Sequence, residues 1–423
     1  MGKDIIWTFS LQIAIMFCSF AITKLLANRM SIDDFGQYNV IKRSVQVISF
    51  VMLAGVGVAL PRYIPLYRKG ESQRPITPLI SASLIYIIGV TLIVCLFCGV
   101  FSKEMQQLML GQAGNTPLFI IALAYAFALA MAQFAFAYFR GIGDFRWYNW
   151  AQFGIQLAIL IPLFFLPMLT TTIVFSSWLI ITSLLVVFYL GRATWKRKVH
   201  LGFVTQNIKV SVAKELKTIV RYSFGRLLAD FFLFSLAAFP LIYISNTQGL
   251  QPTAFFSVGI TFVTMVTPLF SIMGIILLPY VSEAIAKHEL IKANRFIMKL
   301  TLFYIVSSLL ITIFIYIFIN FLTILFFSGS YIVASDLSRI MIFAILPQAL
   351  YLLYRNPIDA VSVIPYNTII LGISLAAMII SFALSSTLTQ LAWAYLGISV
   401  LKGIMSWGTW SFLKNKKRYH GNV

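Results

Sequence analysis

Long apolar runs divide the sequence into regularly spaced segments separated by short polar connectors. A helix rises about 1.5 Å per residue, so about 20 apolar residues cross the hydrocarbon core of a bilayer. The pattern therefore predicts an all-α polytopic membrane protein with about 12 transmembrane helices. The first run is long enough to span and is expected to be retained rather than cleaved as a signal peptide. The predicted spans are 5–27, 38–60, 78–101, 117–139, 149–169, 171–190, 223–245, 253–278, 300–322, 337–354, 366–386 and 389–411.

Composition agrees with this prediction and narrows the class of protein. Of the 423 residues, 60% are hydrophobic and 10% are charged, whereas a soluble domain carries roughly 25% charged residues. Such a chain cannot cover its apolar surface with a polar one. A soluble enzyme, a disordered chain and a receptor with a large folded ectodomain are therefore excluded.

The basic residues are distributed unevenly among the connectors. Most of the 32 Lys and Arg residues lie at the termini or in connectors that follow even-numbered spans, while the opposite side holds Lys24, at the end of the first span, and Arg29 and Lys103. Positive charge accumulates on the cytoplasmic side of membrane proteins. We therefore expect a multi-pass protein of the cell's inner (plasma) membrane with both termini in the cytoplasm.

The net charge of +20 is explained by this topology and does not indicate nucleic-acid binding. A nucleic-acid-binding protein would need a folded basic domain, and the longest basic stretch is the segment 191–222. This segment is expected to lie along the anionic inner leaflet as an amphipathic linker. The predicted organisation is a six-helix lobe over 1–190, the linker 191–222, a second six-helix lobe over 223–411 and a basic tail over 412–423.

The second half of the chain repeats features of the first. Interfacial preferences for proline and aromatic residues at helix ends offer an alternative explanation, but several matches in register favour an internal repeat. Two parallel six-helix copies would be related by a pseudo-two-fold axis along the membrane normal, with a substrate path between them. The matches are Leu60-Pro61 with Leu278-Pro279 and Tyr148-Asn149 with Tyr366-Asn367, both 218 residues apart, and Phe139-Arg140 with Tyr354-Arg355, 215 apart.

Apart from Lys24 near the end of the first span, five basic residues and one acidic residue, Asp230, lie inside predicted spans. A charge near the bilayer centre costs about 2.5–3.5 kcal/mol on insertion scales, so most of these side chains should face a wet cavity or a partner. Their net positive charge suits an anionic substrate such as a phosphate or diphosphate. The five basic residues are Lys42, Arg43, Arg226, Arg339 and Lys402.

Each of these positions also has an alternative explanation. Lys42 and Arg43 share a polar helix face with Gln46, but they are near enough to a helix end to snorkel to the interface. Lys402 is too deep for this, although small neighbours there could simply mark close helix packing. Arg226 lies four residues before Asp230, so the two can pair on one face.

Arg339 and three arginines near the cytoplasmic ends of spans are the remaining charged candidates. Arg339 can pair with the nearby Asp336, which makes it a weaker candidate for substrate binding. Arg62, Arg140 and Arg355 lie where spans meet the cytoplasmic connectors and are candidates for a cytoplasmic gate.

Cysteines and histidines give no sign of a metal site or cofactor. The cysteines lie in apolar runs, where packing thiols are the simplest explanation, and the histidines lie in polar connectors. We therefore expect no cofactor. These residues are Cys18, Cys95, Cys98, His200, His288 and His420. Intramembrane prolines at 162, 240, 268 and 347 permit helix bends.

Two short motifs resemble those of a known family. Asp34-Phe35-Gly36-Gln37-Tyr38 and Phe139-Arg140-Gly141-Ile142-Gly143 resemble segments of the O-antigen and polysaccharide flippases, which belong to the multidrug/oligosaccharidyl-lipid/polysaccharide exporter superfamily. The resemblance extends over the whole chain in span number, orientation and the 6+6 plan. In the second half the matching turn reads Ala254-Phe255-Phe256-Ser257-Val258, where the family more often has Gly-x-Tyr.

The resemblance implies two six-helix lobes around a central cationic cavity that opens alternately to each side. It implies translocation of a polyprenyl-diphosphate-linked oligosaccharide from the cytoplasmic to the outer leaflet. The substrate-binding candidates are then Arg226, Lys402, Lys42, Arg43, Arg339 and Gln46, with Asp230 as the ion-coupling residue. The expected partners are the lipid-linked anionic oligosaccharide and membrane lipids, and other polysaccharide assembly proteins stay open as partners.

Three other functions agree less well with the sequence. A drug exporter that takes cations should line its cavity with carboxylates. The predicted spans contain one carboxylate, Asp230, and five basic residues, which argues against this function. A membrane-embedded polymerase or ligase needs convergent acid–base groups, but the longest outer connector, 102–116, offers Lys103 and Glu104. A major-facilitator-type transporter also has 6+6 helices, but the segment 61–77 lacks that family's Gly-Asp-Arg-rich loop pattern. The sequence therefore favours a flippase and predicts that the protein is not an enzyme.

Overall fold

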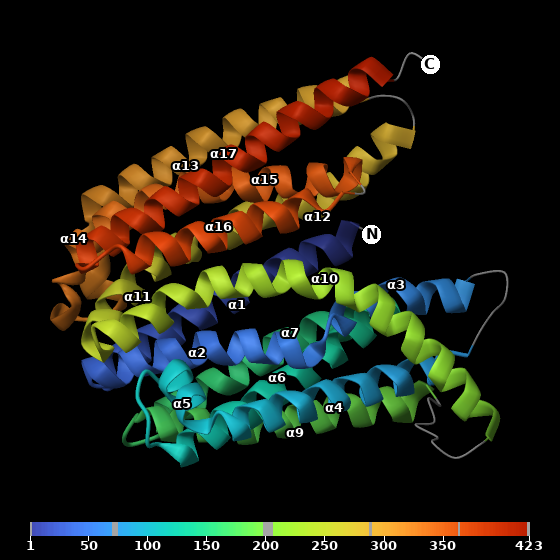
Figure 1. The fold of residues 1–423 in the computed structure, drawn as a ribbon, viewed down its shortest axis with the longest axis horizontal. Helices are drawn as coiled ribbons and strands as arrows, with labels where there is room; N and C mark the ends of the chain where they lie inside the picture. The colour runs from blue at the N-terminus through green and yellow to red at the C-terminus, as the bar shows by residue number, and fades with distance from the viewer. Residues whose placement is uncertain (1, 70–74, 198–205, 287–289, 363, 421–423) are drawn as a thin grey trace. The chain divides into compact units, whose positions relative to one another are not determined.

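The computed structural model describes residues 2–69, 75–197, 206–286, 290–362 and 364–420, and within these ranges the chain forms helices and no strand (Figure 1). Twelve helical segments of this described part are long and apolar enough to cross a membrane. Each of them overlaps one of the twelve spans predicted from the sequence. The prediction of an all-α polytopic membrane protein is therefore confirmed.

The chain divides into two compact units. The first comprises residues 1–234 and 245–250, and the second comprises residues 235–244 and 251–423. The long helix α10 (Gln206–Thr247) contributes to both. It begins within the segment 191–222, so the part of that segment from Gln206 onward is helical and continues directly into the seventh span.

The first unit is built from the helices that precede α10, together with most of α10 itself. In chain order, the helices that precede α10 are α1 (Gly2–Arg29), α2 (Ile32–Leu53), α3 (Val56–Lys69), α4 (Thr77–Val100), α5 (Ser102–Leu110), α6 (Thr116–Gly141), α7 (Phe145–Leu160), α8 (Pro162–Phe165) and α9 (Thr171–Arg197).

The second unit contains residues 235–244 of α10 and the helices that follow α10. Its elements are α11 (Leu250–Met265), α12 (Thr267–Ala286), α13 (Leu290–Phe326), η1 (Gly329–Tyr331), α14 (Ala334–Met341), η2 (Ile342–Ala344), α15 (Ile345–Val361), α16 (Tyr366–Ala383) and α17 (Leu388–His420).

Equivalent helices pack together inside each unit. In the first unit the fourth-span helix α6 contacts α3 and α9, and α7 contacts α9. In the second unit the fourth-span helix α15 contacts α12 and α17, and α16 contacts α17. These three pairings correspond in the two halves, as an internal repeat predicts.

The second span is not the single helix expected over 38–60. It is divided into α2 and α3 at Ala54 and Gly55, which both adopt the left-handed conformation with φ of 51° and 75°. This conformation is unfavourable for residues other than glycine. A Cβ on Gly55 would lie 2.9 Å from the Cβ of Ser223 in α10, so the break also allows close packing of two helices.

The intramembrane prolines differ in their effects. Helices α8 and α12 begin at or just before Pro162 and Pro268, immediately after a break. Pro347 follows the short η2 helix, and Pro240 lies inside the continuous α10. The expected bends are therefore helix interruptions at two of the four positions.

The motif 34–38 has a structural role at the start of α2. Ser31 caps the helix by accepting a hydrogen bond from the backbone N–H of Asp34, 3.1 Å away. Thr171 Oγ1, at the start of α9, donates to Asp34 Oδ1 at 3.2 Å. Phe35 and Tyr38 are buried. The motif therefore ties the first turn of α2 to α9 and to the core of the first unit.

Candidate functional site

Lys402 is a buried cation in the middle of α17, with 9% of its surface exposed. Its Nζ donates a hydrogen bond to Gln348 Oε1 at 2.5 Å and lies 4.7 Å from the centre of the Tyr351 ring. Both groups are on α15, and both are uncharged. Within the described part of the chain, the positive charge is therefore held by an amide oxygen and an aromatic face, without a carboxylate.

Close packing of α15 and α17 brings these groups together. A Cβ on Gly403 would lie 2.9 Å from both the Cβ and the carbonyl oxygen of Pro347, so the two helices meet where one residue has no side chain. Ser399 and Ser406 donate to carbonyls of their own helix, at 3.0 and 2.9 Å. Small-residue packing and the Lys402 site are therefore parts of one arrangement, and the packing positions the lysine.

Arg355 adds a second positive charge to this region. It follows Gln348 and Tyr351, the two partners of Lys402, on α15 at helical spacing, which places the three residues on one face of the helix. The side chain of Arg355 is half-buried. Two cations near one another, with neutral partners at Lys402, make this face of the second unit attractive to an anion.

The polar stripe predicted on the second span is present on α2. Arg43 Nη1 donates to Gln46 Oε1 at 3.5 Å, and Lys42 Nζ lies 5.5 Å from the centre of the Tyr38 ring. Both basic side chains are half-buried. Tyr38 in turn contacts Phe175 and Trp178 of α9, so the stripe borders a buried aromatic cluster in the first unit.

Asp230 and Arg226 both lie on α10, and of these two the structure describes the side chain of Asp230. Asp230 is half-buried, within the span Leu227–Thr247. The side chain of Arg226 lies outside the described residues. The predicted pairing of Arg226 with Asp230 and the roles given to both residues stay predictions.

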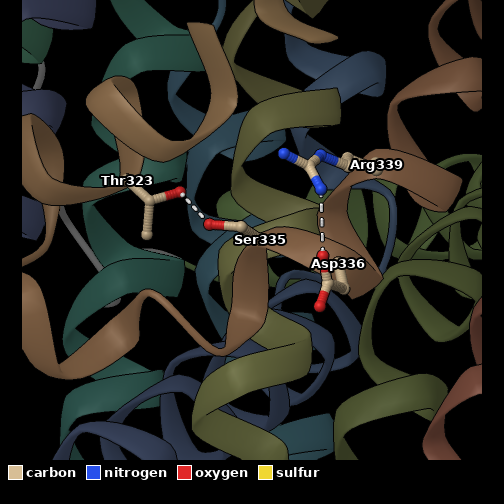
Figure 2. Close-up of polar contacts among 4 residues, drawn as sticks. All are labelled: Thr323, Ser335, Asp336 and Arg339. Atoms are coloured by element: carbon tan, nitrogen blue, oxygen red, sulfur yellow. Dashed lines mark hydrogen bonds and ion pairs between the residues drawn. The ribbon is translucent and has the colours of Figure 1, made fainter. Parts of the chain in front are cut away.

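Arg339 forms an ion pair with Asp336 (Figure 2). Its Nη1 lies 3.1 Å from Asp336 Oδ1, and the Asp336 side chain is 86% exposed. On the same short helix, Ser335 Oγ donates to Thr323 Oγ1 of α13 at 3.3 Å. The pairing of Arg339 with Asp336, the alternative to substrate binding, is therefore observed, and the exposed carboxylate of Asp336 already compensates the charge of Arg339.

The three gate candidates have different surroundings. Arg62 is exposed, and its guanidinium lies 4.7 Å from the centre of the Tyr222 ring on α10. Arg140 is exposed in the last turn of α6. The backbone oxygen of Arg355 accepts a hydrogen bond from Asn367 Nδ2 at 2.8 Å, and Asn367 also donates to Asp359 at 2.7 Å. Asn367, part of the sequence repeat, thus fixes the turn that follows Arg355.

Sequence reasoning did not identify Gln348 and Tyr351 as the partners of Lys402. Their spacing of three residues on the tenth span was a usable signal, but nothing in the sequence indicated which helix would face Lys402. Among the described residues, no group of three or more His, Cys, Asp or Glu side chains could hold a metal ion. His200 and His288 lie outside the described residues.

Comparison with solved structures shows the fold. The chain is similar to a multidrug resistance MATE family transporter of the MOP superfamily in an inward-facing conformation, with a TM-score of 0.76, 13% identity and 96% of each chain covered. It is also similar to the lipid II flippase MurJ, with a TM-score of 0.73, 13% identity, 98% of this chain and 87% of that one covered. The Vibrio cholerae MATE transporter VcmN in its bent form gives a TM-score of 0.57 and 14% identity, with 99% of this chain and 98% of that one covered.

Comparison of sequences shows the family. A search of curated proteins finds no significant match. The family model described as "Polysaccharide biosynthesis protein" matches residues 1–285, which is more than half of the chain. This multi-pass membrane protein therefore belongs to the polysaccharide biosynthesis protein family and has the fold of the MATE and MurJ proteins of the MOP superfamily.

Proposed function

We propose that this protein is a flippase that moves a polyprenyl-diphosphate-linked oligosaccharide from the inner to the outer leaflet of the plasma membrane by alternating access. Membership of a polysaccharide biosynthesis family supports a role in handling glycans. The similarity in fold to a lipid II flippase supports a lipid-linked cargo.

The observation that carries the proposal is the environment of Lys402. A buried ammonium is stable only when its lost hydration is replaced, and here an amide oxygen and an aromatic ring replace part of it. Neither neutralises the charge. An anionic group that reaches this face would therefore gain both the Coulomb attraction and a charge-assisted hydrogen bond.

The other candidates receive their roles from this proposal. Lys42, Arg43 and Gln46 on α2, together with Arg226 on α10, would contact the diphosphate or the first sugars as they pass. Asp230 would change its charge state with access and so couple transport to an ion. Arg62, Arg140 and Arg355 would close the cytoplasmic side. The lipid tail would stay in the bilayer.

Export of small molecules is the alternative function, because solved multidrug resistance MATE transporters have a similar fold. The charge of the cargo separates the two proposals. A cationic drug would be repelled by Lys402 and Arg355, whereas a diphosphate would be attracted. Depleting the protein from its native cell tests this directly: lipid-linked oligosaccharide should accumulate on the cytoplasmic leaflet. Absence of accumulation would favour the small-molecule exporter.

The first prediction concerns Lys402 itself. Replacing it by Met keeps the length of the side chain and removes its charge, so Lys402→Met should lower the flipping rate of lipid-linked oligosaccharide in proteoliposomes by about tenfold or more, the effect of about 1.4 kcal/mol. Lys402→Arg should retain part of the rate. Arg339→Ala is the matched control, because Asp336 already pairs with that cation. Wild-type rates in Lys402→Met would remove Lys402 from the mechanism.

A further inference from the structure

An uncharged polar track lies between α1 and α7 in the first unit. Gln12 Nε2 donates to Gln152 Oε1 at 2.9 Å, and Gln156 Nε2 donates to Ser19 Oγ at 2.9 Å. These four residues are called the amide track here. The two helices contact each other, and all four residues are half-buried. None of the candidate charges described above is part of the track.

The track retains hydrogen-bonding capacity after these contacts. A glutamine amide has two N–H donors and a carbonyl oxygen with two lone pairs. The two cross-helix bonds leave both donors of Gln152, the second donors of Gln12 and Gln156, and the side-chain oxygens of Gln12 and Gln156 without a partner among the described residues. Polar groups exposed to hydrocarbon are costly. We therefore expect this face to meet water or a polar ligand.

The residues of the track follow one another along the span. Gln12 and Ser19 are separated by seven residues on α1, a rise of about 10 Å, and their partners on α7 follow in the same order. At the end near the start of both helices, the Trp7 and Trp150 rings lie 6.0 Å apart. The two residues are 43% and 47% exposed, so accessible aromatic faces adjoin the amides.

We propose that the amide track and this tryptophan pair form a binding surface for the sugar part of the cargo. This inference rests on the proposed flippase function and specifies which part of the substrate the first unit contacts. Amides offer donors and acceptors to sugar hydroxyls, and aromatic faces stack on the apolar faces of sugar rings. The absence of charge on the track suits neutral sugars and gives a diphosphate no Coulomb attraction. The surface therefore selects for hydroxyl-rich cargo, separately from Lys402.

A purely structural role would explain the same hydrogen bonds as contacts that hold α1 to α7. The two explanations differ in what is lost on mutation. Loss of a structural contact should affect every substrate alike. Loss of a sugar surface should affect only substrates that carry sugar, because sites that hydrogen-bond hydroxyls discriminate against analogues lacking them.

The test compares two cargoes in proteoliposomes: the lipid-linked oligosaccharide extracted from the native cell, and bare polyprenyl diphosphate. The double variant Gln12→Leu/Gln152→Leu removes both members of one hydrogen-bonded pair, so neither amide is left without its partner. We expect its rate with the glycosylated cargo to fall about tenfold or more, while its rate with the bare carrier changes less than about twofold. Ser83→Ala is the control, because Ser83 is a buried polar residue of the same unit whose hydroxyl donates to the backbone oxygen of Leu79 in its own helix, α4.

Each other result overturns the inference. Equal losses with both cargoes would assign the track to helix packing, and unchanged rates with both would leave it no role in transport. If the wild-type protein moves neither cargo, the proposed flippase function fails as well, which distinguishes that failure from failure of the track alone. Quenching of tryptophan fluorescence by the released, soluble oligosaccharide gives a readout independent of transport. It should be weaker in Trp7→Phe/Trp150→Phe, and equal quenching would exclude the tryptophan pair.

Discussion

At the scale of single residues, a cation near the membrane is stable only if specific groups replace its water, and two basic residues of this chain show two solutions. Arg29 donates hydrogen bonds to the backbone oxygens of Leu163, Leu166 and Pro167, which closes the end of the short α8 helix. Lys402 has an amide oxygen and an aromatic ring. The carbonyls at Arg29 are structural acceptors that need a donor, whereas the charge of Lys402 stays available.

This difference gives a prediction at the residue scale. Arg29→Ala should lower the free energy of unfolding by about 1 kcal/mol or somewhat more, because carbonyls at the end of α8 lose their charged donor. Thermal unfolding in detergent measures the effect. Lys24→Ala is the control, since Lys24 is an exposed basic residue of the same helix. Equal melting temperatures for the two variants would contradict the capping role of Arg29.

At the scale of helices, close approach is achieved where side chains are missing. Gly403 meets Pro347 between α17 and α15, and Gly55 meets Ser223 between the α2–α3 break and α10. A Cβ at either position would lie as close as 2.9 Å to its neighbours, which side-chain rotation alone cannot relieve at backbone atoms. These glycines therefore set the distance between helices and, at Gly403, the reach of Lys402 to Gln348.

A matched pair of substitutions tests this at the element scale. Gly403→Ala should destabilise the protein by about 1–3 kcal/mol, the usual cost of overpacking, and should lower transport by separating α17 from α15. Gly408→Ala lies on the same helix, where a Cβ meets nothing within 4 Å, and should keep or raise stability, because alanine favours helices. Similar melting temperatures in the two variants would refute the role of Gly403 in packing.

At the scale of the whole molecule, the charge bias of the connectors predicts the orientation in the membrane. Replacing Cys18, Cys95 and Cys98 by Ala gives a background for single-cysteine labelling. A membrane-impermeant maleimide should then label Gln112→Cys from outside intact cells. It should label Ala213→Cys only after the membrane is opened, because that residue follows the sixth span. Both residues are exposed. The opposite labelling pattern would reverse the predicted orientation.

Part of the candidate site could be predicted, and part could not. The positions of Lys402, Lys42 and Arg43 inside apolar runs followed from the sequence, because a charge in such a run is visible locally. The break at Ala54 and Gly55 was missed because hydropathy continues across it, and a left-handed alanine has no clear signature. The contacts of Lys402 with Gln348 and Tyr351 join residues about 50 positions apart, which no local pattern reveals.

The sequence by itself determined the twelve spans, the helical class and the family motifs, since each span depends on the transfer of one continuous apolar segment into lipid. Only the tertiary structure decided which polar groups meet: Lys402 with neutral partners, Gln12 with Gln152, and Arg29 with the end of α8. The physical reason is that burial of a span is a property of its own residues, whereas pairing depends on which helices pack together and in what register.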